Sequence, residues 1–217
     1  MGGESFDHTH LNLFFNPARI IIAGFSNSGK TFLCNQLIQT YVDNFDTILY
    51  SGVDQHPLEV DPLINPKLHV STEIFNPFDY TSSNSKGVLL ILDDCFLEAV
   101  QTKYVVDAFT KGRHKNISII FITQNLFAPG KFSRSIALNC SHYILMKNRD
   151  LGQIETLGRQ IFGSCKSKEF VKVYQKALSY NKYGYLLIDL SPHTPENLNL
   201  RTNILGETPH QIVFQLQ

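Results

Sequence analysis

Residues 24–31 combine two glycines, a lysine and a threonine at a spacing that suits phosphate binding. The run reads Gly24-Phe25-Ser26-Asn27-Ser28-Gly29-Lys30-Thr31. Glycines let backbone N–H groups curl around phosphate oxygens, the lysine reaches the outer phosphates, and the threonine hydroxyl can bind Mg2+. The expected nucleotide contacts are Gly24, Ser26, Asn27, Ser28, Gly29, Lys30, Thr31 and Phe32, with Lys30 also catalytic and Thr31 also a metal ligand. The alternative is a Gly-Lys turn that binds nothing.

Two adjacent carboxylates follow another apolar run. Residues 88–92 lead directly into Asp93 and Asp94. In nucleotide hydrolases the first acid of such a pair holds Mg2+, usually through water, and the next polarises the attacking water. We therefore assign Asp93 to the metal and Asp94 to the general base. The alternative is that an aspartate only caps the helix after the strand.

A third apolar run, residues 117–123, stops at Gln124. In ATPases with an extra strand between the phosphate-loop strand and the acidic strand, a polar residue at this tip faces the terminal phosphate. An amide can donate to that phosphate and accept from the attacking water, so Gln124 suits a catalytic sensor. An ordinary polar turn is the alternative.

A basic cluster, residues 111–115, precedes this strand. Its charges should emerge at the sheet edge opposite the nucleotide, where they are poorly placed to touch ATP in their own subunit. An arginine from a neighbouring subunit can neutralise charge in the transition state, and Arg113 is the catalytic candidate. A solvated basic loop is the alternative.

A second group of cations lies in residues 127–134, together with aromatic residues and a Pro-Gly turn. Lys131 and Arg134 are candidates for salt-sensitive, sequence-independent contacts with DNA phosphates in the channel of a ring. Surface loops often carry such residues, so an ordinary loop is the alternative. Arg149 either approaches the nucleotide or a neighbouring subunit, or pairs with Asp150 or Glu155.

The elements that must position these residues alternate between strands and helices. Runs that are apolar on both faces, as in a parallel sheet covered by helices, occupy residues 19–23, 47–50, 88–92, 117–123 and 143–146. Helical spacing is found in residues 31–42, 98–109 and 150–162. Further strands are expected over 184–190, 201–205 and 211–215. The predicted class is α/β, with a mostly parallel sheet extended by C-terminal strands.

Composition limits the number of domains, the kind of nucleic-acid binding and the cellular location that we expect. With 217 residues, 43% of them hydrophobic, we expect a single domain over residues 1–217, with its core in about 17–206. Lys plus Arg and Asp plus Glu both number 19, so there is no global basic field for nucleic acid and any basic surface must be local. Scattered cysteines and the lack of an apolar stretch of about 18 residues favour an intracellular protein without a membrane segment.

The order of these motifs resembles the FtsK–HerA superfamily of DNA-pumping ATPases, especially its viral genome-packaging branch. The resemblance is carried by residues 24–31, 90–94, 113–117 and 122–127. The run 112–127, together with 141–143, 147–150 and 183–190, is similar to the packaging ATPases of Polinton or Maverick elements and of adintoviruses. The tail 194–204 fits the same pattern, so the resemblance covers about residues 17–206.

This resemblance implies a P-loop NTPase with a RecA-like sheet that forms a ring, a hexamer or a pentamer. Such a ring uses ATP and Mg2+ to drive double-stranded DNA into a preformed capsid, so DNA and capsid proteins are the expected partners. The implied location is the host cell, nucleus or cytoplasm, or the virion. Many members of the superfamily carry Glu in place of Asp94, which implies slower turnover here.

Two other functions compete with this one. A small P-loop kinase is disfavoured by Asp93 and Asp94 combined with Gln124, which kinases do not need. A nucleotide-dependent scaffold for capsid assembly stays open.

Overall fold

The computed structural model describes residues 5–6, 13–14, 17–52, 64–83, 85–127, 130–205 and 211–216. The strands in this part of the chain are β1 (Ser5–Phe6), β2 (Arg19–Ala23), β3 (Thr47–Gly52), β4 (Leu68–Ser71), β5 (Val88–Asp93), β6 (Ile117–Thr123), β7 (His142–Met146), β8 (Tyr185–Asp189), β9 (Leu200–Thr202) and β10 (Gln211–Phe214). The α-helices are α1 (Lys30–Tyr41), α2 (Phe96–Ala99), α3 (Lys103–Lys111), α4 (Ser133–Asn139), α5 (Leu151–Phe162) and α6 (Ser167–Leu178).

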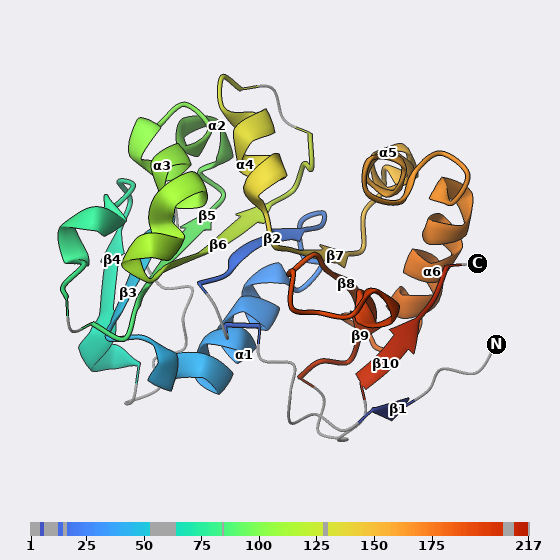
Figure 1. The fold of residues 1–217 in the computed structure, drawn as a ribbon, viewed down its shortest axis with the longest axis horizontal. Coiled ribbons are helices and arrows are strands. Elements are labelled where there is room, and N and C mark those ends of the chain that lie inside the picture. The colour runs from blue at the N-terminus through green and yellow to red at the C-terminus, as the bar shows by residue number, and fades with distance from the viewer. Residues whose placement is uncertain are drawn as a thin grey trace.

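The described strands form one sheet in the order β1-β10-β9-β8-β7-β2-β6-β5-β3-β4 (Figure 1). Six of them, from β7 to β4 in this order, run parallel to one another. The predicted α/β class and mostly parallel sheet are therefore confirmed. Strand β6 lies between β2 and β5, so the strand that ends at Gln124 separates the phosphate-loop strand from the acidic strand.

The C-terminal strands extend the sheet in the antiparallel sense. Strand β8 pairs with β7, β9 with β8, β10 with β9, and β1 with β10. This extension agrees with the expectation, although β9 and β10 are shorter than the ranges 201–205 and 211–215. Because β8 runs against β7, it begins at the sheet edge where β2, β5 and β6 end.

The central strands are buried on both faces, and alternate residues enter two separate cores. In β2, Ile20 and Ile22 pack in the same core as Leu33 and Leu37 of α1. The intervening Ile21 packs in the opposite core, which is filled from α3, α4, α5 and α6. The period of two follows from the pleat of a strand. Figure 1 shows α1 on one side of the sheet and α3 and α4 on the other.

The structure corrects two predicted segments and adds two elements that were not predicted. The single helix expected over residues 98–109 is wrong: α2 ends at Ala99 and α3 begins at Lys103, because Thr102 has an extended backbone, with φ of −88° and ψ of 118°. The carbonyl of Val100, in the same break, accepts a hydrogen bond from Phe132 N at 3.1 Å. The loop expected over 127–134 ends one residue before Ser133, where α4 begins. Helix α6 and the edge strand β4 were not predicted.

Within the described ranges, no helix has the length and apolar character needed to cross a membrane.

Candidate active site

The loop between β2 and α1 is anchored to the strands on both sides of β2. Gly24 N donates to the carbonyl of Thr123 at the end of β6 (3.2 Å), and Phe25 N donates to the carbonyl of Lys147 just after β7 (3.0 Å). Asn27 and Gly29 adopt left-handed backbone conformations, with φ of 61° and 96°. Glycine reaches this region without steric cost, so the spacing of the motif matches the turn that the loop makes.

Lys30 is buried in this loop, with 8% of its surface exposed. Its Nζ donates to the carbonyls of Gly24 (2.9 Å) and Phe25 (3.0 Å). An ammonium has three N–H donors, so one remains for a ligand while two hold the loop closed. Burial lowers the pKa of Lys30, and the negative charges of Asp94 and Asp93 oppose that shift.

The loop also presents a polar atom that suits an anionic ligand. Ser28 Oγ is buried and makes no hydrogen bond within the described part of the chain. Buried polar atoms are nearly always paired, so an unpaired one in a loop of this shape fits a place for a ligand oxygen. A Cβ added to Gly24 would lie 2.6 Å from Ser28 Oγ and 2.9 Å from Met146 Cβ. Only glycine therefore leaves this side of the loop open.

The two aspartates at the end of β5 have different surroundings. Asp93 Oδ2 accepts a hydrogen bond from the hydroxyl of Tyr50 on the neighbouring strand β3, at 2.7 Å. Asp94 is exposed and adopts a left-handed conformation, with φ of 52°. The turn thus separates the two side chains, which suits different tasks for them. Sequence reasoning missed Tyr50.

A series of polar contacts joins the loop to the tips of β6 and β5. Ser26 Oγ donates to Gln124 Oε1 at 3.3 Å, and Gln124 Nε2 donates to Asp94 Oδ1 at 3.5 Å. All three side chains are exposed. The strand register brings these side chains together. Ala23 pairs with Thr123 and Asp93 pairs with Ile122, so the residues that follow these strand ends leave the sheet next to one another. The structure brings the predicted loop, sensor and base together.

The donor set at this edge fits Mg2+. Asp93 and Thr31 provide carboxylate and hydroxyl oxygens, the ligand type that this hard cation prefers, and Mg2+ usually takes its remaining ligands from water and phosphates. No group of three or more His, Cys, Asp or Glu side chains suited to a metal occurs in the described ranges. A site of two protein ligands completed by phosphates needs no such group.

Arg149 lies beside the loop. Its guanidinium carbon lies 5.1 Å from the centroid of the Phe25 ring. Asp150 instead caps α5 by accepting from Gly152 N and Gln153 N, and Glu155 pairs with Arg159 at 3.8 Å. The described contacts of Arg149 thus place it against Phe25 of the loop, while Asp150 and Glu155 have other partners; its approach to a nucleotide or a neighbouring subunit stays a prediction.

The remaining candidate residues come from other segments of the chain. Arg113 is exposed in the short 3-10 helix η5 (Gly112–Lys115), at the amino end of β6 and therefore at the opposite edge of the sheet from residues 24–31. Lys131 is exposed, with Nζ 5.0 Å from the Phe132 ring centroid. Arg134 is exposed in the first turn of α4, so the expectation that it lies in a loop is wrong.

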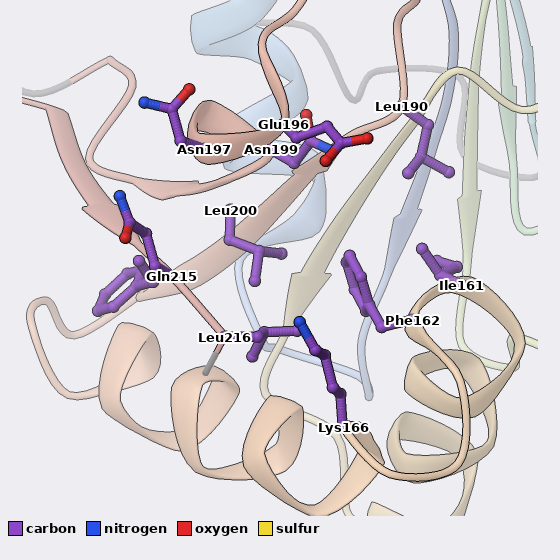
Figure 2. Close-up of a pocket in the computed structure, with 11 residues that line it drawn as sticks. Ile161, Phe162, Lys166, Leu190, Glu196, Asn197, Asn199, Leu200, Gln215 and Leu216 are labelled. Atoms are coloured by element: carbon purple, nitrogen blue, oxygen red, sulfur yellow. The ribbon is translucent and has the colours of Figure 1, made fainter.

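A cavity of about 460 Å3 lies between α5, α6 and the C-terminal strands (Figure 2). Its walls include Ile161, Phe162, Leu190 and Leu216, with Lys166 and Glu196 among its polar side chains. None of the predicted site residues lines it. The candidate active site therefore does not coincide with this cavity, and it is identified from the chemistry of its residues.

No protein-family model matches the sequence, and no curated protein matches it either. Solved structures of the genome packaging NTPase B204 from Sulfolobus turreted icosahedral virus 2 are similar in fold. The complex with ATP-gammaS has a TM-score of 0.57 and 14% identity, over 82% of this chain and 95% of that chain. The complex with AMPPCP has a TM-score of 0.57 and 15% identity, over 82% and 96%.

A further match is B204, the DNA-packaging ATPase from Sulfolobus turreted icosahedral virus, with a TM-score of 0.55 and 16% identity, over 81% of this chain and 94% of that chain. The chain therefore has the fold of a P-loop NTPase.

Proposed function

We propose that this protein is an ATPase that drives double-stranded DNA into a capsid. The observation that carries the enzymatic part is the series of contacts from Ser26 through Gln124 to Asp94, next to the buried Lys30. It joins a phosphate loop to a polar sensor and a carboxylate, which are the groups that ATP hydrolysis requires.

Each of these residues has a task in hydrolysis. The backbone of residues 24–32 and Lys30 would bind the phosphates, and Thr31 and Asp93 would hold Mg2+. Tyr50 keeps the Asp93 carboxylate in place through its hydroxyl. Asp94 orients the attacking water and accepts its proton, while the Gln124 amide links that water to the terminal phosphate. ATP with Mg2+ supplies the phosphoryl group and the cation that balances its charge.

The amide of Gln124 is already held between the loop and the base. A change in the loop when nucleotide binds can therefore pass to Asp94 through a single side chain. This arrangement suits a motor, because the same contacts that position the water can report the state of the phosphate.

The DNA-packaging part is supported by fold similarity to structures described as a genome packaging NTPase and a DNA-packaging ATPase, and by the motif order that resembles the FtsK–HerA superfamily. We propose a ring, a hexamer or a pentamer, in which Arg113 acts on the neighbouring subunit's ATP. Lys131 and Arg134 would contact DNA phosphates, and capsid proteins would be the second partner. The proposed branch is that of Polinton, Maverick and adintovirus packaging ATPases, and the proposed location is the host cell or the virion.

The position of Arg113 supports its role across a subunit boundary. It lies at the amino edge of the parallel strands, while the loop of residues 24–31 lies at the carboxyl edge, so one subunit cannot bring them together. In a head-to-tail ring the amino edge of one subunit can face the carboxyl edge of the next.

The proposal is tested by measuring ATP hydrolysis across a range of protein concentrations, with and without double-stranded DNA. A ring in which each site needs its neighbour should show a rate per subunit that rises with concentration and with DNA. A rate per subunit that responds to neither would refute the motor. Nuclease protection of DNA mixed with capsids and ATP then tests packaging itself.

A further inference from the structure

Two exposed aromatic rings stand beside the loop of residues 24–31. Phe32 and Tyr183 keep 56% and 41% of their surface exposed, and their ring centroids lie 5.8 Å apart. Phe32 follows Thr31 in α1, whereas Tyr183 comes from the turn between α6 and β8. Aromatic side chains are usually mostly buried in a folded chain. An exposed pair from two distant segments, next to a ligand loop, therefore indicates a binding surface.

The backbone holds Tyr183 in this place. Tyr185 pairs with Met146 at the end of β7, so Tyr183 lies near the tip of the strand that neighbours β2. Gly184 N donates to the carbonyl of Asn181 at 3.0 Å and closes the turn. A Cβ added to Gly29 would lie only 2.8 Å from Cδ1 of Tyr183. The ring thus rests directly on the loop, at the point where α1 begins.

A lysine cation also lies over the face of the Tyr183 ring. Nζ of Lys182 lies 5.3 Å from the ring centroid, a distance at which a cation is attracted to an aromatic face. Lys182 is exposed, so it can move aside at little cost. Nucleobases bind aromatic faces by stacking, whatever their hydrogen-bonding pattern.

We propose that Tyr183, with Phe32, forms the platform on which the nucleobase stacks. This inference rests on the proposed function, because it requires that residues 24–31 bind the phosphates of a nucleotide. A nucleotide held there carries its base on the same molecule, and the platform adjoins the loop through the contact of Tyr183 with Gly29. Stacking does not read the edges of the base, so the platform binds adenine and guanine alike.

Calorimetric titration of the full chain with ATP, GTP and inorganic tripolyphosphate, each with Mg2+, separates the contribution of the base to the binding affinity from that of the phosphates. Tyr183→Ala should weaken ATP and GTP binding about tenfold, as is typical for the loss of one stacking ring. Binding of tripolyphosphate should not change. Tyr183→Phe should behave as the wild type, because it keeps the ring. Tyr180→Ala is the matched control, since Tyr180 is 42% exposed in the same turn but faces Phe214 at 6.1 Å.

Two results with Tyr183→Ala would overturn the platform. Equal weakening of ATP and tripolyphosphate binding would mean that the ring only supports the loop, and unchanged ATP binding would mean that the base binds elsewhere. Titration of the wild-type protein shows whether only the platform is refuted or the proposed ATPase function as well. If it binds ATP and tripolyphosphate equally well, the platform alone is refuted; if it binds neither, the proposed ATPase fails and the platform with it.

Discussion

Asp189 is the centre of a buried charged cluster at the amino edge of the parallel strands, and replacing it with asparagine gives a sharp test of the fold. Its carboxylate accepts hydrogen bonds from Arg201, from Thr194 Oγ1 at 2.9 Å and from Ser191 N at 3.0 Å. His142 Nε2 lies 3.2 Å from Oδ1. Asp189 and Arg201 are 3% and 1% exposed. Asp189→Asn keeps the shape of the side chain but removes the charge that balances Arg201.

The expected loss of stability is large for one substitution. Two nitrogens of Arg201, Nε and NH1, already have no partner among the described residues, so the guanidinium depends on Asp189. Breaking a buried ion pair by removing one partner costs about 3–5 kcal/mol. For a chain of this size each kcal/mol lowers Tm by about 2–4 °C, so Tm should fall by about 6–20 °C. Differential scanning calorimetry of the wild type and the variant measures this directly.

Two companion variants make the result interpretable. Asp189→Asn combined with Arg201→Met should recover part of the lost Tm, because it removes the unpaired buried charge as well. Asp107→Asn, which breaks the exposed pair with Lys111 on α3, should leave Tm nearly unchanged. A fall in Tm for Asp189→Asn no larger than that for Asp107→Asn would refute the reasoning about burial.

The same cluster predicts how stability depends on pH. Burial alone would raise the pKa of Asp189, but hydrogen bonding and charge from His142, with help from Ser191 N and Arg201, hold it below its usual value. Because the folded pKa is the lower one, the stabilisation is complete above the usual aspartate pKa of about 4 and is lost as pH falls through the folded value. Urea unfolding at pH values from roughly 2 to 7 measures the free energy of unfolding on both sides of this transition. That free energy should fall at low pH in the wild type and should fall less in Asp189→Asn.

Three further substitutions test the candidate active site. Lys30→Ala should weaken ATP binding by at least about tenfold, because hydrogen bonds to charged groups contribute about 1.5–3 kcal/mol; normal affinity in calorimetry would reject the phosphate role. Asp94→Asn should leave ATP binding nearly intact and lower the single-turnover rate by about 10²–10⁴; an unchanged rate would move the base elsewhere. Arg113→Ala should lower kcat, and mixing it with Asp94→Asn subunits should restore part of the activity; failure of the mixture would count against action on a neighbour.

Much of the sheet was predictable because its central strands are buried on both faces. Runs such as 117–123 contain little except apolar residues, and such runs are typical of parallel strands covered by helices. The predicted bounds for β2 and β6 are those observed. Strand β4 was not predicted because it lies at the edge of the sheet and is only partly buried. At the break between α2 and α3, the carbonyl of Val100 pairs with Phe132 N, a contact between distant residues that no local pattern indicates.

The types and order of the chemical groups were determined by the sequence alone. The spacing of Gly24, Gly29, Lys30 and Thr31 predicts a phosphate loop, because a short loop has few ways to present several N–H groups and a lysine together. Tertiary structure alone decided which distant groups meet. The order β2-β6-β5 puts Gln124 between Ser26 and Asp94, and the antiparallel return of β8 puts Tyr183 on Gly29. Such contacts depend on strand pairing across long stretches of chain, which local composition does not encode.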